Sequence, residues 1–298
     1  MIDPQPTLTE NATLARGLQA RDLWQGYGDH TVLSGINVSL PPGKFTAILG
    51  HNGCGKSTLL KSLAGMMPVK RGSVTLEGQP IKSFATKALA RQVSYLAQGA
   101  VAPEGLSVAE LVAQGRYPHR KIFASWNAAD TDAVERALSL TATKDLSDRP
   151  LQELSGGQRQ RAWIAMTLAQ EGRIVLLDEP TSFLDPAHQL EVLSLVRRLI
   201  RDEGTTVAAV LHDLNHAAQF ADHIILLKAG QLLAEGSPQE VVTPDILRDA
   251  FGLDVEILRH PQTGAPICVP RMADAGGAGV TPVASPDVSP VQPRTGAQ

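Results

Sequence analysis

A short run of glycines followed by lysine and serine is the segment of this sequence with the clearest capacity for chemistry. Its spacing satisfies G-x-x-x-x-G-K-[ST], and it lies between the apolar run FTAIL and the helix-like run STLLKSLAG. Glycines let backbone N–H groups curl around phosphate oxygens, and a helix N-terminus adds partial positive charge. The segment therefore predicts a site for the phosphates of ATP, formed by Gly50, His51, Asn52, Gly53, Cys54, Gly55, Lys56 and Ser57.

Individual side chains at the end of this loop have distinct expected tasks. Lys56 reaches the β- and γ-phosphates, Ser57 can ligate Mg²⁺, and Thr58 can donate to the α-phosphate. His51 and Cys54 invite metal or redox interpretations, but both occupy variable positions of the motif, so we interpret each first as a loop filler. A glycine-rich turn that merely joins strand to helix is the alternative, and the strand–loop–helix context disfavours it.

Two carboxylates, Asp178 and Glu179, follow a second apolar run, IVLL. Successive residues of a strand point in opposite directions, so the two acids cannot share one task. We expect Asp178 to hold Mg²⁺, directly or through water, and Glu179 to face the γ-phosphate and polarise the attacking water as general base. A chance pair of surface acids is the alternative, which the phosphate loop upstream makes the weaker one.

Buried strands must carry these two loops. Short apolar or β-branched runs bounded by Gly and Pro predict strands at Phe45–Leu49, Ile174–Leu177, Thr206–Leu211 and His223–Leu227. Apolar residues at helical spacing predict a helix over Ala187–Glu203, which begins after Pro186 and ends before Gly204. Strands that alternate with helices imply a parallel sheet covered on both faces.

Composition limits the classes of function. The chain has 298 residues and a formal charge of −3, so it lacks the sequence-wide basic field that draws a protein onto nucleic acid. Cys54 and Cys268 are too few for a disulfide framework and lack the spacing of a zinc site, which fits a reducing compartment. No apolar run approaches the ~18 residues that cross a bilayer, and the N-terminus lacks the pattern of a signal peptide.

The alternation of strands and helices is interrupted once. Residues 99–154 contain helical patterns around 107–114 and 130–140, and we interpret them as a helical subdomain inserted in a core of residues 18–98 and 155–270. Residues 1–17 are polar and 271–298 are rich in Pro, Gly and Ala, so both are expected to be disordered. No internal repeat is evident, which indicates one nucleotide domain.

The run Leu154-Ser155-Gly156-Gly157-Gln158 opens a helix-like segment and resembles the signature of ABC ATPases. Ser155 is a good helix cap, and the glycines after it leave amides open for a second anion. The resemblance implies that two copies meet head to tail, so that each signature closes over the γ-phosphate held by its partner's loop. It also implies the fold: an α/β P-loop NTPase (RecA-like) parallel-sheet core with an inserted helical subdomain and an N-terminal antiparallel β part.

Further positions match this family residue by residue. Tyr27 resembles the aromatic residue that stacks on adenine, although a core or surface tyrosine is the alternative, with Trp24 nearby. Gln98 resembles the glutamine that contacts Mg²⁺ and senses the attacking water. Ala97 stands where the subgroup often has proline, a departure that concerns loop rigidity more than chemistry.

Two matching positions lie after the acidic pair. Asp185 matches the loop that crosses the dimer interface, with Ser182 where threonine is frequent, and His212 matches the histidine that contacts the γ-phosphate. The segment from His212 to His216 also imitates a helical zinc site with two histidines. Asp213 stands where that site needs its glutamate base, so we favour the phosphate contact.

Longer phrases, including APEGLSVAELVAQGRYPH, TSFLDPAHQLEVL and VLHDLNHAAQFADHII, resemble the ATPase subunits of ferric siderophore importers, with haem and vitamin B12 importers as relatives. This resemblance implies as partners a second copy, a membrane permease and, indirectly, a substrate-binding protein. It implies a peripheral position at the cytoplasmic face of the inner membrane. The residues Arg116, His119, Arg120 and Lys121 form a basic cluster in the inserted segment, which we interpret as a solvated loop rather than a permease or lipid contact.

Three other functions compete with import. An ABC ATPase that acts on DNA or ribosomes usually carries a coiled-coil insertion or two fused ATPase domains, for which 298 residues leave no room. A regulator that binds ATP without turnover would not need so complete a set of catalytic positions. Exporter ATPases remain open, because the chemistry of hydrolysis does not depend on the direction of transport.

Overall fold

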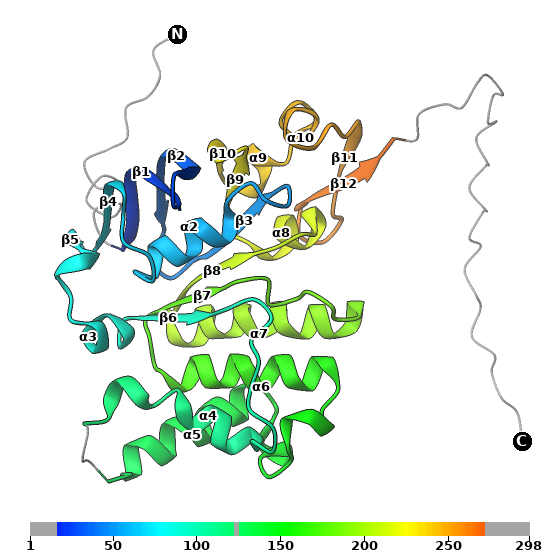
Figure 1. Cartoon of the computed structure of the whole chain (residues 1–298). Helices are drawn as coiled ribbons and strands as arrows, with labels where there is room; N and C mark the ends of the chain where they lie inside the picture. The colour runs from blue at the N-terminus through cyan, green and yellow to red at the C-terminus, as the bar shows by residue number, and fades with distance from the viewer. Residues whose placement is uncertain (1–16, 122–124, 272–298) are drawn as a thin grey trace, which may run out of the picture.

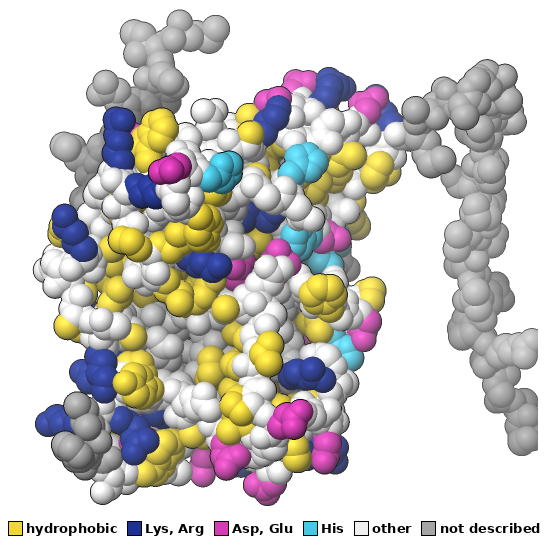
Figure 2. Space-filling model, viewed as in Figure 1, with side chains coloured by type: hydrophobic (Ala, Val, Ile, Leu, Met, Phe, Trp, Pro, Cys, Tyr) yellow, Lys and Arg dark blue, Asp and Glu magenta, His cyan; other side chains and the backbone are white. Residues whose placement is uncertain are grey.

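The computed structural model describes residues 17–121 and 125–271, which form a mixed sheet, an antiparallel sheet and a helical end (Figure 1). The expected N-terminal extension and C-terminal tail lie almost wholly outside the described residues. Of the helices formed by the described ranges, none is long and apolar enough to cross a membrane. In the face drawn in Figure 2, basic side chains gather along the left side, acidic side chains gather at the lower right, and apolar side chains lie across the middle.

The mixed sheet has the strand order β10-β9-β3-β8-β7-β6. Its strands are β3 (Phe45–Gly50), β6 (Val93–Leu96), β7 (Ile174–Leu177), β8 (Thr206–Val210), β9 (His223–Lys228) and β10 (Gln231–Gly236). All neighbours pair in parallel except β10, which is antiparallel to β9. The four strands predicted from apolar runs are confirmed within one residue at their ends.

Each central strand supplies two hydrophobic cores in alternation. In β3, Ala47 packs with the helices on one face of the sheet, while Ile48 packs with the antiparallel sheet and its neighbours on the other. Leu176 and Leu177 of β7 divide in the same way. Because both faces are covered, these strands are continuously apolar rather than alternating with polar residues.

The antiparallel sheet has the order β2-β1-β4-β5 and covers one face of the core. Its strands are β1 (Leu18–Tyr27), β2 (His30–Leu40), β4 (Arg71–Leu76) and β5 (Gln79–Pro80), and a separate hairpin joins β11 (Val255–Arg259) to β12 (Pro266–Pro270). The N-terminal antiparallel part that the family resemblance implied is therefore confirmed, together with the α/β class.

Helices join and cover the strands. They are α2 (Lys56–Leu63), α3 (Thr86–Ala90), α4 (Val108–Gln114), α5 (Ala128–Leu140), α6 (Gly156–Ala169), α7 (Pro186–Glu203), α8 (Leu214–Phe220), α9 (Pro238–Val241) and α10 (Pro244–Phe251). Single turns of 3-10 helix occur at Ile81–Ser83, Tyr117–His119, Lys144–Leu146 and Leu151–Glu153. The predicted α7 is confirmed: Pro186 is its first residue, Asp185 caps it, and Gly204 ends it with φ 65°.

The helical end consists of α4, α5 and α6, which share a third core. Ala162 and Ala165 of α6 belong to this core, whereas Ile164 of the same helix packs with the main one. The signature helix thus touches both parts of the molecule. Our division at residues 154 and 155 remains a proposal, because α6 joins the two parts rather than lying in one.

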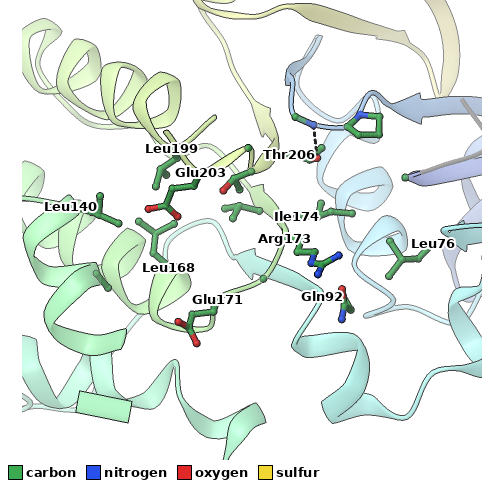
Figure 3. A pocket seen from close by; sticks show the side chains of 18 of the residues that line it. Leu76, Gln92, Leu140, Leu168, Glu171, Arg173, Ile174, Leu199, Glu203 and Thr206 are labelled. Atoms are coloured by element: carbon green, nitrogen blue, oxygen red, sulfur yellow. Dashed lines mark hydrogen bonds between the residues drawn. The ribbon is translucent and has the colours of Figure 1, made fainter. Parts of the chain in front are cut away.

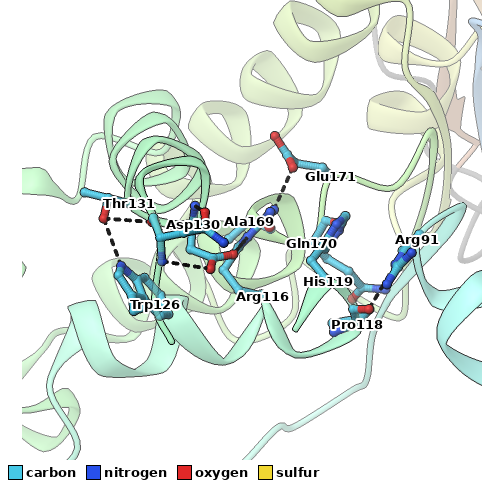
Figure 4. Close-up of polar contacts among 11 residues, drawn as sticks. Arg91, Arg116, Pro118, His119, Trp126, Asp130, Thr131, Ala169, Gln170 and Glu171 are labelled. Carbon is cyan, nitrogen blue, oxygen red and sulfur yellow. Dashed lines mark hydrogen bonds and ion pairs between the residues drawn. The ribbon is translucent and has the colours of Figure 1, made fainter. Parts of the chain in front are cut away.

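Arg116 is buried, which corrects its interpretation as part of a solvated basic loop (Figure 4). Its side chain pairs with Asp130 at 3.1 Å and with Glu171 at 2.6 Å, and also donates to the carbonyl of Ala169 at 2.7 Å. These contacts tie the end of α4 to the start of α5 and the end of α6. His119 is also engaged, since its Nε2 lies 2.8 Å from the carbonyl oxygen of Gln170.

We expect Arg116→Ala to lower the free energy of unfolding by about 3 to 5 kcal/mol, because it leaves the Asp130 carboxylate, 3% exposed, without its cation. Arg201→Ala is the matched control, since Arg201 pairs with Asp202 where both side chains are more than half exposed. That change should leave the urea midpoint of unfolding nearly unchanged, because water screens an exposed pair. Urea unfolding of both variants is the measurement, and equal losses would contradict a structural role for the buried pair.

Candidate functional site

The phosphate loop joins β3 to α2 and needs glycine at two positions, at Gly50 because backbone lies too close and at Gly55 chiefly because of its φ. A Cβ at Gly50 would lie 2.3 Å from the carbonyl oxygen of Leu227, and one at Gly55 would lie 2.5 Å from Leu33 Cδ2. Gly55 also precedes α2 with φ 105°, and no side chain caps the helix there. The first amides of α2 are therefore open to an anion, as the sequence motif predicts.

Lys56 folds back over this loop. Its Nζ donates to the carbonyl oxygens of Gly50 at 2.8 Å and His51 at 2.9 Å, and the residue is only 5% exposed. Two carbonyl oxygens thus satisfy donors of a buried ammonium at the mouth of the loop. This is the arrangement from which the side chain can turn to phosphate oxygens.

The two variable positions of the loop are occupied differently. Cys54 is buried, and burial is the main reason that the pKa of its thiol is raised, so it fits the predicted role of a filler. His51 instead meets Phe251 of α10 edge to face, with ring centroids 5.1 Å apart. The sequence analysis did not foresee this contact between the loop and the C-terminal part of the chain.

Asp178 faces the start of α2. Its Oδ1 accepts a hydrogen bond from the Ser57 hydroxyl at 2.8 Å, and its Oδ2 accepts one from the Tyr95 hydroxyl at 3.2 Å. Burial raises the pKa of the Asp178 carboxyl, while the hydrogen bonds from Ser57 and Tyr95 oppose that rise. Burial and the negative Asp178 also raise the pKa of the Tyr95 phenol.

Glu179 lies in surroundings separate from those of Asp178, after β7 has ended at Leu177 and with a left-handed backbone of φ 54°. Its Oε2 lies 3.0 Å from His212 Nε2 and accepts a hydrogen bond from the Ser182 hydroxyl at 2.7 Å. Burial would raise the pKa of this carboxyl, but the bonds from His212 and Ser182 and the charges nearby outweigh it, so the pKa lies below its ordinary value. The group is therefore an ionised acceptor at neutral pH.

The signature run caps α6 with a reciprocal pair of hydrogen bonds. Ser155 Oγ accepts from the Gln158 amide at 3.3 Å, and the Gln158 side chain accepts from the Ser155 amide at 3.0 Å. Nothing lies within 4 Å of a Cβ built at Gly156, so this face of the helix start is open. Within the described ranges, no hydrogen bond joins this run to the phosphate loop of the same chain.

The remaining predicted positions lie around these groups. Tyr27 ends β1 and is 54% exposed, and Gln98 is exposed just after β6. Asp185 caps α7 and contacts His188. His216 packs on Phe220 rather than beside His212, which contacts Glu179, so the two histidines have separate surroundings.

A pocket of about 480 Å³ lies elsewhere, between the helical end and the core (Figure 3). Gly43, Ile174 and Thr206 line it, at the starts of β3, β7 and β8, and an Arg136–Glu203 ion pair of 2.8 Å crosses it. Ligand sites of parallel sheets form at the carboxyl ends of strands. The phosphate loop, Asp178 and Glu179 meet that rule, and this pocket does not.

Comparison with known proteins relates this arrangement to one family. Residues 33–182 match the family model described as ABC transporter. The ferric enterobactin transport ATP-binding protein FepC of Escherichia coli K12 is 48% identical over 263 residues, which cover 88% of this chain and 96% of FepC. The iron(3+)-hydroxamate import ATP-binding protein FhuC of Bacillus subtilis 168 is 46% identical over 252 residues, 85% of this chain and 94% of FhuC.

A solved structure agrees with these relatives. The dimeric structure of MJ0796, a bacterial ABC transporter cassette, superimposes with a TM-score of 0.66 and 25% identity, covering 74% of this chain and 98% of that one.

Proposed function

The chain belongs to the ABC transporter family of ATP-binding subunits, and from that premise we propose that it hydrolyses ATP to energise uptake of a ferric siderophore through a separate membrane permease. The observation that carries the ATPase part is the pair of contacts beside the phosphate loop, Ser57 with Asp178 and Glu179 with His212. The cargo rests on the names and near-complete coverage of FepC and FhuC.

In this proposal the phosphate loop holds the nucleotide and Glu179 activates the attacking water. Lys56 leaves its two carbonyl partners for the β- and γ-phosphates, and the open amides of α2 hold the remaining phosphate oxygens. Glu179, ionised and aimed by His212 and Ser182, accepts the proton of the attacking water. His212 then lies where it can also donate to the γ-phosphate.

The residues beside the loop fit Mg²⁺ as the second cofactor. Ser57 and Asp178 offer a hydroxyl and a carboxylate oxygen 2.8 Å apart, which are the hard ligands this ion prefers. Gln98, exposed after β6, is a third candidate oxygen. When bound with ATP, the ion supplies neutralising charge for the phosphates.

We propose that two copies complete each other's sites. Ser155 and Gly156 present an open helix start that the chain's own phosphate loop does not use. Phe183, in the loop before Asp185, is 98% exposed with φ 62°, so this loop presents an apolar side chain that a second copy would cover. The relative MJ0796 is dimeric. A two-fold pair would join each loop to the other copy's signature.

The permease and the position at the membrane also belong to this proposal. We propose that the helical end binds permease subunits at the cytoplasmic face of the inner membrane, with Gln98 at its junction to the core. A substrate-binding protein loaded with the ferric chelate would act through the permease. Tyr27, exposed at the end of β1, would stack on adenine.

Affinity capture from membranes tests the transport proposal. A tagged chain should retain a many-helix permease, and its ATPase rate should rise with a binding protein loaded with ferric siderophore. Stimulation only by haem or cobalamin would change the cargo, while capture of ribosomes or DNA would overturn transport.

Tyr95→Phe should raise the Mg²⁺ concentration for half-maximal ATPase activity about tenfold, because the Tyr95 hydroxyl no longer orients the Asp178 carboxylate. Tyr117→Phe is the control, since Tyr117 is 70% exposed in the helical end. Magnesium titration of steady-state turnover is the measurement, and identical curves for both variants would exclude Tyr95 from the site.

A further inference from the structure

His188, in the first turn of α7, contacts two motifs of its own chain. Its Nδ1 lies 2.6 Å from Asp185 Oδ2, and its backbone amide donates to Asp185 Oδ1 at 3.1 Å. The imidazole ring also lies against the signature helix, because a Cβ built at Gly157 would be 2.6 Å from His188 Cδ2. One side chain therefore joins the loop that ends at Asp185 to the first turn of α6.

The two signature positions hold glycine for different reasons. Gly156 faces open space, where a ligand can approach its backbone, whereas Gly157 is buried under the ring of His188. Any side chain at position 157 would push that ring away from the helix. Gly157 therefore makes room for a contact within the chain, and Gly156 leaves its backbone open to an anion.

A second contact repeats this alignment one turn further along both helices. Arg161 of α6 pairs with Glu191 of α7, and the Arg161 side chain is only 17% exposed. The two helix starts are consequently held together at two levels. These contacts therefore join the start of α6 to the loop that carries Phe183 and Asp185. The two segments form one continuous surface.

We propose that His188 is a positioning residue that holds the Asp185 loop and the signature helix in the joint arrangement needed to pair with a second copy. This inference rests on the proposed ATP-dependent pairing. It assigns His188 no contact with ATP, since it acts through Asp185 and Gly157. Two segments fixed to each other before association lose less freedom when the partner orders them, which favours pairing.

The expected defect is confined to pairing. The phosphate loop and α2, which hold the nucleotide within one copy, make no hydrogen bond to His188 among the described residues. His188→Ala should therefore leave the binding of ADP with Mg²⁺ to single copies unchanged. It should raise the ATP concentration at which copies pair.

The test uses the full chain carrying Glu179→Gln. With ATP bound and not hydrolysed, two copies of this chain should accumulate as a stable pair. Light scattering during ATP titration gives the midpoint of pairing, and calorimetry gives ADP affinity. Adding His188→Ala should raise the midpoint about tenfold, equivalent to about 1.4 kcal/mol. Ser194→Ala, exposed further along α7, is the matched control and should leave the midpoint unchanged.

Two further variants separate the contacts of His188. His188→Asn keeps a donor for Asp185 but removes the ring from Gly157, so its midpoint should lie between those of the parent and His188→Ala. Gly157→Ala should displace the ring, and adding His188→Ala to it should cost less than the sum of the separate effects, because the clash is removed.

Each outcome decides between the two proposals. If the Glu179→Gln chain itself does not pair in ATP, the proposed ATP-dependent pairing fails, and the inference that rests on it fails too. If that chain pairs and His188→Ala pairs at the same ATP concentration, the inference is overturned. A parallel loss of ADP affinity and thermal stability in His188→Ala would also overturn it, because that pattern indicates a general folding defect.

Discussion

Glu179→Gln should reduce ATP turnover by about 10² to 10⁴-fold, the usual contribution of a positioned general base. The substituted amide has nearly the same shape and can still meet Ser182 and His212, but it cannot accept the proton of water. ATP affinity should therefore remain, and the bound state should persist as a pair. Steady-state phosphate release measures the first effect, and light scattering in ATP with Mg²⁺ measures the second.

Glu203→Gln is the matched control for this experiment. Glu203 pairs with Arg136 at the opposite end of the sheet, so its loss should leave turnover unchanged.

Glu179 can act as a base only while its carboxyl group is ionised, which sets a lower limit to the pH of turnover. Because its pKa lies below the ordinary value, protonation of this group should not reduce turnover at pH 6. Wild-type rates in Glu179→Gln would remove it as the base.

The phosphate loop and the acidic pair were predictable because their geometry is local. A glycine spacing between a strand and a helix specifies positive φ angles and open amides within a few residues. Likewise, the apolar run IVLL places Asp178 and Glu179 directly after the carboxyl end of β7, although it does not show that the chain leaves the strand there or that Glu179 has φ 54°. The structure gives the two carboxyl groups different partners and opposite pKa shifts.

Contacts between distant segments were not predictable in the same way. Tyr95 reaches Asp178 from 83 residues away, because β6 pairs with β7 in the sheet. His188 meets Gly157 only after α6 and α7 pack side by side. In both cases the sequence shows an ordinary tyrosine or histidine, and a parallel strand order or a helix packing decides what it touches.

Arg116 illustrates how a local charge pattern misleads. The run RYPHRK has the composition of a solvated basic loop, which made surface exposure the natural interpretation. The structure instead draws Arg116 inward, where Asp130, Glu171 and a helix-end carbonyl satisfy its donors. Its burial depends on three helix ends that converge from separate parts of the sequence. Charge density along the chain therefore says little about which member of a cluster faces water.

Lys56→Ala should weaken ATP binding about 100-fold, equivalent to about 2.7 kcal/mol, because bonds from an ammonium to phosphate are each worth about 1.5 to 3 kcal/mol. Calorimetric titration with ATP and Mg²⁺ is the measurement. Lys44→Ala is the control, because Lys44 is exposed just before β3, at the opposite end of that strand from the loop, and should bind ATP normally.

The variant also removes the donor that satisfies the carbonyls of Gly50 and His51, so collapse of the loop must be separated from loss of the charge. A comparison of three nucleotides separates the two causes. A loss specific to phosphate contact should grow from AMP to ADP to ATP, since Lys56 is expected to reach the β- and γ-phosphates. A collapsed loop would weaken all three nucleotides alike, and unchanged ATP affinity would contradict the phosphate-loop assignment itself.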